Sequence, residues 1–451
     1  MKKNFIRLAI LGALIILCIG QTIQLWLGDM SGHTFFTNTS QNIMTQPKNI
    51  WVNYSGLAYK IEGNNNDSRE DLLMELAYII RTSSYNINKE NEVSYKGLLE
   101  NEGFVYEYAL PLSLGEIIGY TIKDAGAKNI YTDIKTIFVK LESSDTKIYL
   151  IDSDDNVKFC IDSNDKLVLH ERINDYYAEA NRETEEKTYQ SSILNANYSN
   201  AFTNNIFYPL DNTNKPIMYP SLEIKDIIDY KKDEKIKILE SYMNPFFKNP
   251  DYKYFHHTDN GVVFNDALDM NVYYDYKGYI EFNKRYEEGN TNVSEDEQLA
   301  IVNKYIEDTE QIPYSIKQGI FLEQIEKDIE TGETIYKFGY KYEGFQVLLS
   351  KETSQTMNMD CFVQIGIKGN QVVNGKWIMK EIVPSSNLAE YDYNMLQKEG
   401  YVAISEAQDL CDIEDITTTP LSDMQCVYMI NNEGNVDFKW AALYEDEWYY
   451  K

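Results

Sequence analysis

Histidines and cysteines, the residues that most often bind metals or attack substrates, are few in this chain. The sequence holds four histidines and five cysteines in 451 residues. His170 and Glu171 begin like the HExxH helix of zinc proteases, but Asn174 stands where the second histidine belongs. A helix brings two zinc ligands onto one face only at that spacing, so the pattern excludes this class of zinc site.

Asp152, Asp154 and Asn156 begin like a calcium-binding loop. Such a loop needs glycine at its sixth position and a bidentate acid at its twelfth, and the chain has Val157 and Ser163 there. We therefore predict that this segment is a hairpin turn.

Gly369 and Gly375-Lys376 resemble a phosphate-binding loop. Five residues separate the two glycines instead of four, and Trp377 stands where a magnesium-binding hydroxyl belongs. The segment is better interpreted as a hairpin between two strands of a sheet.

His256 and His257 are the only adjacent histidines, and they lie in a segment typical of a strand. Neighbouring side chains of a strand point to opposite faces, so one metal ion could hardly bind both. We predict no metal site here.

Nucleophilic catalysis has no evident machinery, because the chain lacks a Gly-x-Ser-x-Gly motif and a cysteine in a reactive setting. Pairs of carboxylates are plentiful by chance among 71 acidic residues, and a glycosidase would need two of them across a cleft. The sequence singles out no such pair. We therefore predict no catalytic, cofactor-binding or metal-binding residue, and a protein that is not an enzyme.

The composition is that of an acidic protein with enough apolar residues for large cores. The net charge is −29, the pI is near 4.5, and 43% of the residues are hydrophobic. Such a surface repels nucleic acid and anionic lipid headgroups. We expect no nucleic-acid partner.

Four cysteines follow the first 27 residues: Cys160, Cys361, Cys411 and Cys426. They are too few for a disulfide framework in a region of this size. Cys411 and Cys426 could pair if their strands are adjacent and the compartment is oxidising. The alternative is that all four are small buried hydrophobic residues.

The amino-terminal segment has the pattern of a membrane anchor. Lys2, Lys3 and Arg7 precede the uncharged run Leu8–Leu27, and about 20 helical residues cross a hydrocarbon core of about 30 Å. Positive charge on the amino-terminal side places that end in the cytoplasm. The bulk of the chain is then extracytoplasmic, behind a single-pass cell-membrane anchor.

Two kinds of cleaved signal compete with this interpretation. A signal peptide would have the shorter core Leu8–Gly20, but residues 20–23 offer no small-x-small cleavage site. A lipoprotein signal would use Cys18, which follows the bulky Leu17 instead of a small residue. Length and flanking charge favour the uncleaved anchor.

One face of the predicted anchor could bind another helix. At 100° per residue, five positions of this helix fall on one side. Small residues among them allow a second helix to approach closely, and an amide side chain can form a hydrogen bond to that helix. The face consists of Ala9, Ala13, Ile16, Gly20 and Gln24. The alternative is that alanine and glycine are simply common in spanning helices.

Hydrophobic periodicity predicts an α+β fold of several small modules, with mostly antiparallel sheets and packed helices. Capping-type starts predict helices from Asp67, Ser113, Ser294 and Ser405, and a further helix covers 233–242. A strand over 104–110 should stop at Pro111. The other predicted strands are 50–54, 134–141, 148–151, 157–161, 167–170, 252–255, 262–264, 271–276, 321–329, 334–342, 345–350, 361–367, 425–430, 438–444 and 447–450.

Composition shifts divide the chain into five parts. Residues 1–27 form the cytoplasmic tip and anchor, and 28–46 form a polar tether. An amino-terminal domain covers 47–210, in which 174–205 is a surface helix or connection. A middle α/β module covers 211–292, and a carboxy-terminal domain covers 293–451.

Several stretches resemble the YycH family, with a carboxy-terminal part similar to its sister family YycI. The most specific is Phe246–Gly261, continuing through Asn271–Asn283; Tyr106–Leu114, Thr334–Leu348 and Lys439–Tyr450 resemble further strands of these families. Family members are membrane-anchored extracytoplasmic regulators of the cell-wall sensor kinase of low-GC Gram-positive bacteria. The resemblance implies a non-enzymatic role, α/β modules on one spanning helix, and a complex with a sister protein and a sensor histidine kinase.

Three functions follow from these features. The first is a regulator that binds a histidine kinase through the spanning helix and the outer domain. The alternative is a membrane-anchored glycan-binding or hydrolytic protein of the cell wall, which would need a cleft with convergent acids or stacked aromatic residues and a raised carboxylate pKa. The third is a structural tether. The sequence does not distinguish an activator from a repressor.

Overall fold

The computed structural model describes most of the chain beyond the predicted tether. The ranges are 45–54, 56–61, 66–82, 87–88, 93–119, 132–141, 146–163, 189–196, 198–209, 221–228, 236–266, 269–287, 293–384, 400–413, 419–431, 434–445 and 447–450. All of them belong to one compact unit, Met44–Lys451. In these ranges no helix has both the length and the apolar character needed to span a membrane. The predicted anchor lies outside them.

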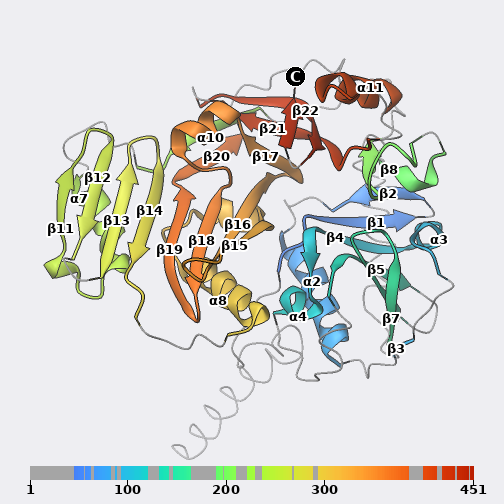
Figure 1. Ribbon diagram of the computed structural model, residues 1–451, viewed down its shortest axis with the longest axis horizontal. Helices are drawn as coiled ribbons and strands as arrows, with labels where there is room; N and C mark the ends of the chain where they lie inside the picture. Colours follow the sequence, from blue (N-terminus) through green and yellow to red (C-terminus); the bar gives the residue numbers. More distant parts are fainter. Residues whose placement is uncertain are drawn as a thin grey trace, which may run out of the picture. The chain divides into compact units, whose positions relative to one another are not determined.

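A nine-stranded sheet gathers the amino-terminal strands (Figure 1). Its order is β3-β7-β6-β5-β4-β1-β2-β8-β9, and every described neighbour is antiparallel. The strands are β1 (Asn49–Tyr54), β2 (Leu57–Lys60), β3 (Ile87–Asn88), β4 (Gly103–Leu112), β5 (Ile134–Leu141), β6 (Thr146–Ile151), β7 (Val157–Ser163), β8 (Tyr189–Ser191) and β9 (Phe207–Pro209).

Helices cover this sheet because its strands alternate apolar side chains between two faces. Ile50 and Val52 of β1 pack with α2 (Asn66–Thr82) and α4 (Leu114–Ile118) in one core. Trp51, between them, belongs to a second core with α3 (Tyr95–Leu99). The predicted helix from Asp67 is confirmed, and Leu72 and Leu76 on its apolar face are fully buried.

Three predictions for this half need correction or lie outside the described residues. β4 does not end before Pro111 but continues to Leu112, with a register shift between Glu107 and Leu112. The shift lets the strand accommodate a residue that cannot donate a ladder hydrogen bond. The described part of 174–205 contains β8 and a short 3-10 helix, η2 (Ser192–Leu194), because its residues pair with β2. The predicted strand 167–170 lies outside the description.

A twelve-stranded sheet gathers strands from the middle and the end of the chain. Its order is β11-β12-β13-β14-β19-β18-β16-β17-β21-β22-β23, with β15 beside β16, and β17–β21 is its one parallel pair among the described strands. The strands are β11 (Tyr254–His257), β12 (Gly261–Asn265), β13 (Met270–Asp275), β14 (Tyr279–Lys284), β15 (Ile320–Asp328), β16 (Glu333–Tyr342), β17 (Phe345–Leu349), β18 (Val363–Lys368), β19 (Gln371–Ile378), β21 (Asp423–Ile430), β22 (Val436–Tyr444) and β23 (Glu447–Tyr450).

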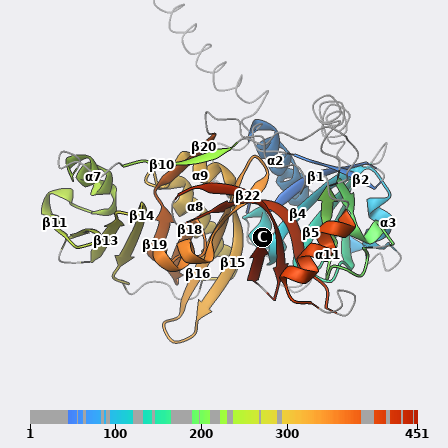
Figure 2. The same ribbon diagram turned by 90° about the horizontal axis from the view of Figure 1, so that it is seen from above.

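The predicted boundary at 292/293 falls inside this sheet. β14 comes from the predicted middle module and β19 from the predicted carboxy-terminal domain, and the two pair over 279–283 and 374–378. β10 (Leu222–Asp226) and β20 (Lys380–Pro384) form a separate ribbon that also joins the two parts (Figure 2). The division into three outer domains stays a prediction. At its last boundary, the two parts contribute strands to the same sheet.

The helices of this half are α7 (Ile236–Met243), α8 (Glu295–Asp308), α9 (Tyr314–Gly319), α10 (Lys351–Met357) and α11 (Gly400–Leu410), with 3-10 helices η4 (Asn244–Phe246) and η5 (Pro250–Tyr252). The predicted capping boxes at Ser113 and Ser294 are both present. Ser405, by contrast, is not a helix start, because α11 already begins at Gly400. Overall the prediction of an α+β fold with mostly antiparallel sheets is confirmed.

Candidate functional site

The residues predicted to bind a partner helix, Ala9, Ala13, Ile16, Gly20 and Gln24, lie outside the described residues and remain a prediction. The same holds for the excluded zinc motif at 170–174. The remaining motifs can be placed.

The segment that begins like a calcium loop is the turn between β6 and β7, as predicted. Asp152 Oδ1 accepts hydrogen bonds from the backbone N–H groups of Asp154 (3.0 Å) and Asn156 (2.8 Å), and Lys158 pairs with its other oxygen at 2.5 Å. Asp155 has φ of 62°. The carboxylate of Asp152 therefore stabilises the turn from inside, which is a structural role.

The segment that resembles a phosphate loop is the β18–β19 hairpin, as predicted. Gly369 has φ of 58° at the turn, and Gly375 and Lys376 lie within β19. Lys376 Nζ donates to the carbonyl of Asn358 at 3.0 Å. Its ammonium group also pairs with Glu281 of β14 at 3.4 Å, so Lys376 has a structural role in the sheet.

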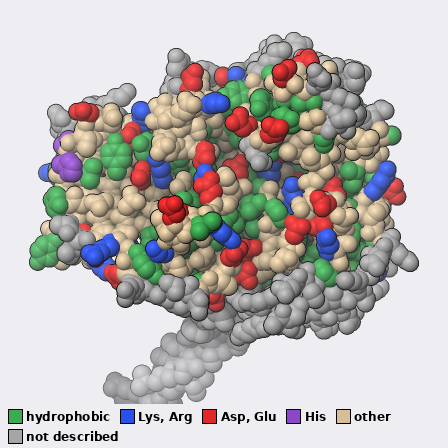
Figure 3. Space-filling model, in the orientation of Figure 1, with side chains coloured by type: hydrophobic (Ala, Val, Ile, Leu, Met, Phe, Trp, Pro, Cys, Tyr) green, Lys and Arg blue, Asp and Glu red, His purple; other side chains and the backbone are tan. Residues whose placement is uncertain are grey.

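His256 and His257 lie on β11, at one end of the twelve-stranded sheet, and both are exposed (Figure 3). His257 Nδ1 is 3.2 Å from the hydroxyl of Tyr276. Across the described ranges, no group of three His, Cys, Asp or Glu side chains is placed to hold a metal ion.

Cysteine placement decides between the two alternatives left by the sequence. Cys411 and Cys426 carry thiols and form no disulfide, so that pairing is wrong. All four cysteines are buried, which confirms their interpretation as small hydrophobic residues. Burial raises the pKa of the Cys411 and Cys426 thiols, which makes them poor nucleophiles.

A cluster of buried charges lies where the two large sheets meet. We call it the junction; it comprises the segment Thr45–Asn49 together with Glu107, Lys341 and Asp423. Lys48 pairs with Asp423 of β21 at 2.5 Å, and the two side chains are 14% and 18% exposed. This ion pair links the start of the described chain to its carboxy-terminal sheet.

Glu107 accepts two hydrogen bonds from side chains of β1. Trp51 Nε1 donates to Glu107 Oε2 at 2.6 Å, and Asn49 Nδ2 donates to the same oxygen at 3.0 Å. Lys341 of β16 donates to the carbonyl of Lys48 and to Asn49 Oδ1. The junction thus joins β1, β4, β16 and β21 through polar contacts.

The rest of the segment Thr45–Asn49 is held from several sides. The backbone N–H of Thr45 donates to the carbonyl of Ile117 at 3.0 Å, and its hydroxyl donates to that of Glu116 at 2.7 Å. Arg69 of α2 donates to the carbonyl of Pro47 at 2.7 Å, and Asn303 of α8 donates to the Thr45 hydroxyl at 3.4 Å. The end of the predicted tether and the residues after it therefore contact both halves of the fold, and the fold begins two residues earlier than predicted.

Burial and neighbouring charges shift the pKa values of the junction residues in different directions. It raises the pKa of Glu107, and the bonds from Trp51 and Asn49 only partly oppose it. Burial acts the same way on Asp423, but the ammonium of Lys48 and the hydrogen bond from the Met424 N–H together outweigh it, and the pKa of Asp423 is lowered. For Lys341, burial and the positive charges of Lys60 and Lys48 lower the pKa well below its usual value.

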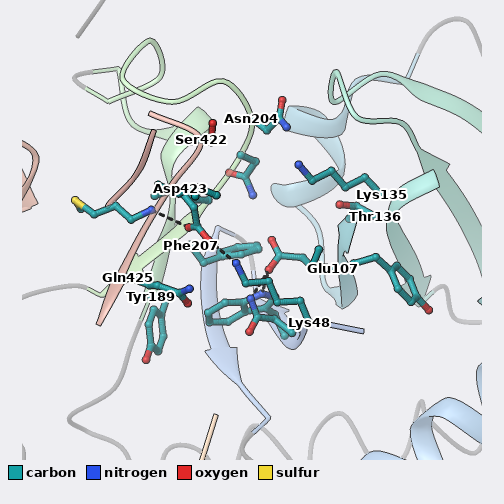
Figure 4. A pocket seen from close by; sticks show the side chains of 18 of the residues that line it. Lys48, Glu107, Lys135, Thr136, Tyr189, Asn204, Phe207, Ser422, Asp423 and Gln425 are labelled. Atoms are coloured by element: carbon teal, nitrogen blue, oxygen red, sulfur yellow. Dashed lines mark hydrogen bonds and ion pairs between the residues drawn. The ribbon is translucent and has the colours of Figure 1, made fainter. Parts of the chain in front are cut away.

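A cavity of about 340 Å³ opens beside the junction (Figure 4). It contains three lysines and three acids, together with a wall of aromatic rings. The lining residues with these side chains are Lys48, Lys60, Lys135, Glu107, Asp155, Asp423, Trp51, Tyr108, Tyr189, Phe207 and Phe345. A second cavity of about 670 Å³ shares Lys48 with the first and is lined by Glu323, Lys337 and Trp448 among others.

Sequence reasoning missed this site because its members are far apart in the chain. One signal was available: on β4, Glu107 stands two residues after Val105, so it shares a face with a side chain that is fully buried. A charged residue at such a position is almost never buried without partners. The partner residues could not be named without the order of the strands.

Comparisons with solved structures bear on this fold. The crystal structure of YycH from Bacillus subtilis aligns with a TM-score of 0.55 over 92% of this chain and 97% of that one, at 11% sequence identity. The chain has the YycH fold. The resemblance predicted from the sequence is thereby confirmed at the level of the fold.

The other comparisons add no relative. The carboxy-terminal domain of YpeB from Bacillus megaterium aligns over 50% of this chain and 92% of that one, with a TM-score of 0.25 and 9% identity, which is too distant to support an argument. No family profile matches the sequence, and no curated protein matches it.

Proposed function

We propose that this protein is a non-enzymatic extracytoplasmic regulator of a sensor histidine kinase that controls cell-wall metabolism. The observation that carries the proposal is the YycH fold over 92% of the chain. The predicted anchor at 1–27 supports it, because a regulator that acts by contact needs a spanning helix and a rigid outer body. Its partners are then the kinase and a sister protein of the YycI type, and its location is the cell membrane.

The anchor face provides the test of this proposal. Ala9→Leu with Ala13→Leu adds bulk to the predicted packing face and should reduce co-purification of the full chain with a YycG-type kinase from cross-linked membranes. Cys18→Leu is the matched control, because at 100° per residue it falls on the opposite side of the same helix. All variants should insert into membranes normally. Equal co-purification of both variants with the kinase would count against the face.

A second candidate, the cell-wall hydrolase, is favoured by one observation. Glu107 and Asp155 line the same cavity, and burial raises the pKa of both, that of Asp155 to about 6. Against it, Glu107 accepts bonds from Trp51 and Asn49, and Asp155 Oδ2 accepts one from the Asn205 N–H at 2.6 Å. We expect the full chain to release no soluble fragments from purified cell wall. Release that disappears in Glu107→Gln would establish the hydrolase instead.

A further inference from the structure

The charges that line the junction cavity are balanced. Lys48, Lys60 and Lys135 face three acids, and Asp423 is already paired with Lys48. A buried site with equal numbers of both signs disfavours a ligand of net charge, because the added charge loses its hydration without a surplus of opposite charge to replace it. It favours a neutral ligand that carries both signs.

The lysines of the cavity lie close to its acids: Lys48 pairs with Asp423, and the charge of Lys135 acts on both Asp155 and Asp423. In the view of Figure 4, Lys135 enters from the side opposite Tyr189 and Gln425, while Glu107 lies beside Lys48. The ammonium group of Lys135 forms no ion pair with any described residue. The raised pKa of Glu107 and of Asp155 shows that the protein alone does not fully compensate these carboxylates.

Aromatic rings form the apolar part of the wall. Trp51 packs against Tyr189 with ring centroids 4.9 Å apart and against Phe207 at 4.6 Å. The Lys60 ammonium lies 5.2 Å from the Trp51 ring and 5.7 Å from that of Phe345. The cavity therefore combines a small apolar surface with a few polar groups, as small-molecule sites do, and its volume is at the lower end of their range.

We propose that this cavity binds a small zwitterion, either a free amino acid or a short peptide with charged ends. The ligand carboxylate lies at Lys135, and its ammonium group lies at Glu107 and Asp155. This deepens the proposed function, since it names the class of signal that the regulator senses.

Lys48 gives ligand binding a route to the membrane side of the protein. Its side chain lines both cavities and pairs with Asp423, and its backbone carbonyl accepts from Lys341. Lys48 also belongs to the segment Thr45–Asn49, which begins with the last two residues of the predicted tether. A ligand that alters the charge balance around Lys48 therefore acts on the residues that lead to the anchor.

The test uses the full chain in detergent and four probes: alanine, and three forms of one dipeptide that differ in which end is charged. Alanine and alanyl-alanine carry both charges, N-acetyl-alanyl-alanine lacks the ammonium, and alanyl-alanine amide lacks the carboxylate. In calorimetric titration we expect at least one zwitterion to bind in the millimolar range or tighter, and each blocked dipeptide to bind about tenfold more weakly than alanyl-alanine or not at all. A preference for alanine or for alanyl-alanine shows whether the natural ligand is a free amino acid or a short peptide.

Variants assign the two ends of the ligand. Glu107→Gln keeps an acceptor for Trp51 and Asn49 but removes the charge, and Lys135→Met keeps the stem of the lysine. Both should weaken binding about tenfold, whereas Lys304→Met on the exposed side of α8 should not change it. Circular dichroism checks that each variant is folded.

Hydrogen exchange measures the coupling through Lys48. Binding should slow exchange in peptides that cover residues 45–54. The proposal is overturned if neither zwitterion binds, or if N-acetyl-alanyl-alanine binds as well as alanyl-alanine. Binding that leaves exchange at 45–54 unchanged overturns the coupling. Co-purification with the kinase is scored separately without any probe, so its loss would refute the proposed function and leave the cavity assignment standing.

Discussion

Two lysine–aspartate pairs show how differently the same chemistry acts at the junction and on the exposed side of α8. Lys48 and Asp423 are separated by 375 residues in sequence, and their side chains are 14% and 18% exposed. Lys304 and Asp308 are one helical turn apart at 2.9 Å, and their side chains are 60% and 61% exposed. The first pair links the start of the described chain to the carboxy-terminal sheet. The second lies on the surface of one helix, which forms without it.

The difference lies in what remains when one partner is removed. At the junction the surviving charge stays buried without compensation, which costs far more than the pair itself contributes. On α8 the surviving charge is solvated at once. Mutations at the junction should therefore lower the free energy of unfolding by much more than matched mutations on the exposed side of α8.

The largest effect is expected for Lys48→Met, which keeps the aliphatic stem but leaves Asp423 unpaired. The free energy of unfolding should fall by about 3–5 kcal/mol. Lys304→Met is the control and should change it by less than about 0.5 kcal/mol. Urea denaturation followed by tryptophan fluorescence measures both. Similar losses in the two variants would show that burial does not distinguish the regions.

Two capping boxes make the same comparison for helix starts. Ser113 Oγ accepts from the Glu116 N–H at 3.1 Å and also donates to Asp296 of α8 at 2.7 Å, whereas the contact made by Ser294 Oγ is the one that it accepts from the Glu297 N–H at 3.3 Å. Ser294→Ala should cost about 1 kcal/mol. Ser113→Ala also loses a hydrogen bond to a charged group and should cost about 2–3 kcal/mol.

The contrast between these two serines can be checked by denaturation of both alanine variants under identical conditions. Ser113→Thr is a further control, because threonine keeps the hydroxyl that both contacts require. It should recover most of the loss. An equal loss for Ser113→Ala and Ser294→Ala would mean that the contact with α8 contributes nothing.

Asp155 and Asp423 line one cavity but should respond to pH in opposite directions. Burial raises the pKa of folded Asp155 from 3.8 to about 6, so the folded state binds this proton more tightly and stability rises as pH falls through that window. Lys48 lowers the pKa of Asp423, so its contribution is present above its unfolded pKa and is lost as pH falls through the lower folded value.

The variant Asp155→Asn isolates the first of these responses. It keeps an acceptor for the Asn205 N–H and tolerates the φ of 62° at this position. Above pH 6 it should be more stable than wild type by about 1–2 kcal/mol, since partial exposure screens the full linkage energy. Below pH 4 the difference should vanish. Parallel curves of stability against pH for the two proteins would contradict this assignment.

The residues that could be predicted from the sequence are those whose structure depends on near neighbours. The capping boxes at Ser113 and Ser294 and the hairpin turn at Asp152 need only a few residues, and all three are present. Ser405 has the same pattern but lies inside α11, which begins at Gly400, and Ile404 next to it packs in a core with Ala442 of β22. Local chemistry predicts a possible cap, and packing decides whether it is used.

The junction could not be predicted for the opposite reason. Its pairs depend on a strand order in which β21 lies beside β17 and β4 beside β1, and periodicity does not fix that order. Lys341 shows the problem: it lies on a strand whose alternating tyrosines were enough to predict β16, yet nothing local indicates that its ammonium bonds to the carbonyl of Lys48. Buried charge is a property of the assembled sheets.

The smallest effect is expected for the coupling between Lys304 and Asp308, measured by a double-mutant cycle with Lys304→Met and Asp308→Ala. Pairs of this spacing on an exposed helix contribute about 0.3–0.5 kcal/mol. Raising the salt to about 1 M shortens the screening length to about 3 Å and should reduce the coupling toward zero. The same cycle at Lys48 and Asp423 should keep most of its coupling energy in salt, because a largely buried pair is screened much less than an exposed one. A salt dependence as strong at the junction as on α8 would show that solvent screens Lys48 and Asp423 as fully as an exposed pair, and burial would then not distinguish the two regions.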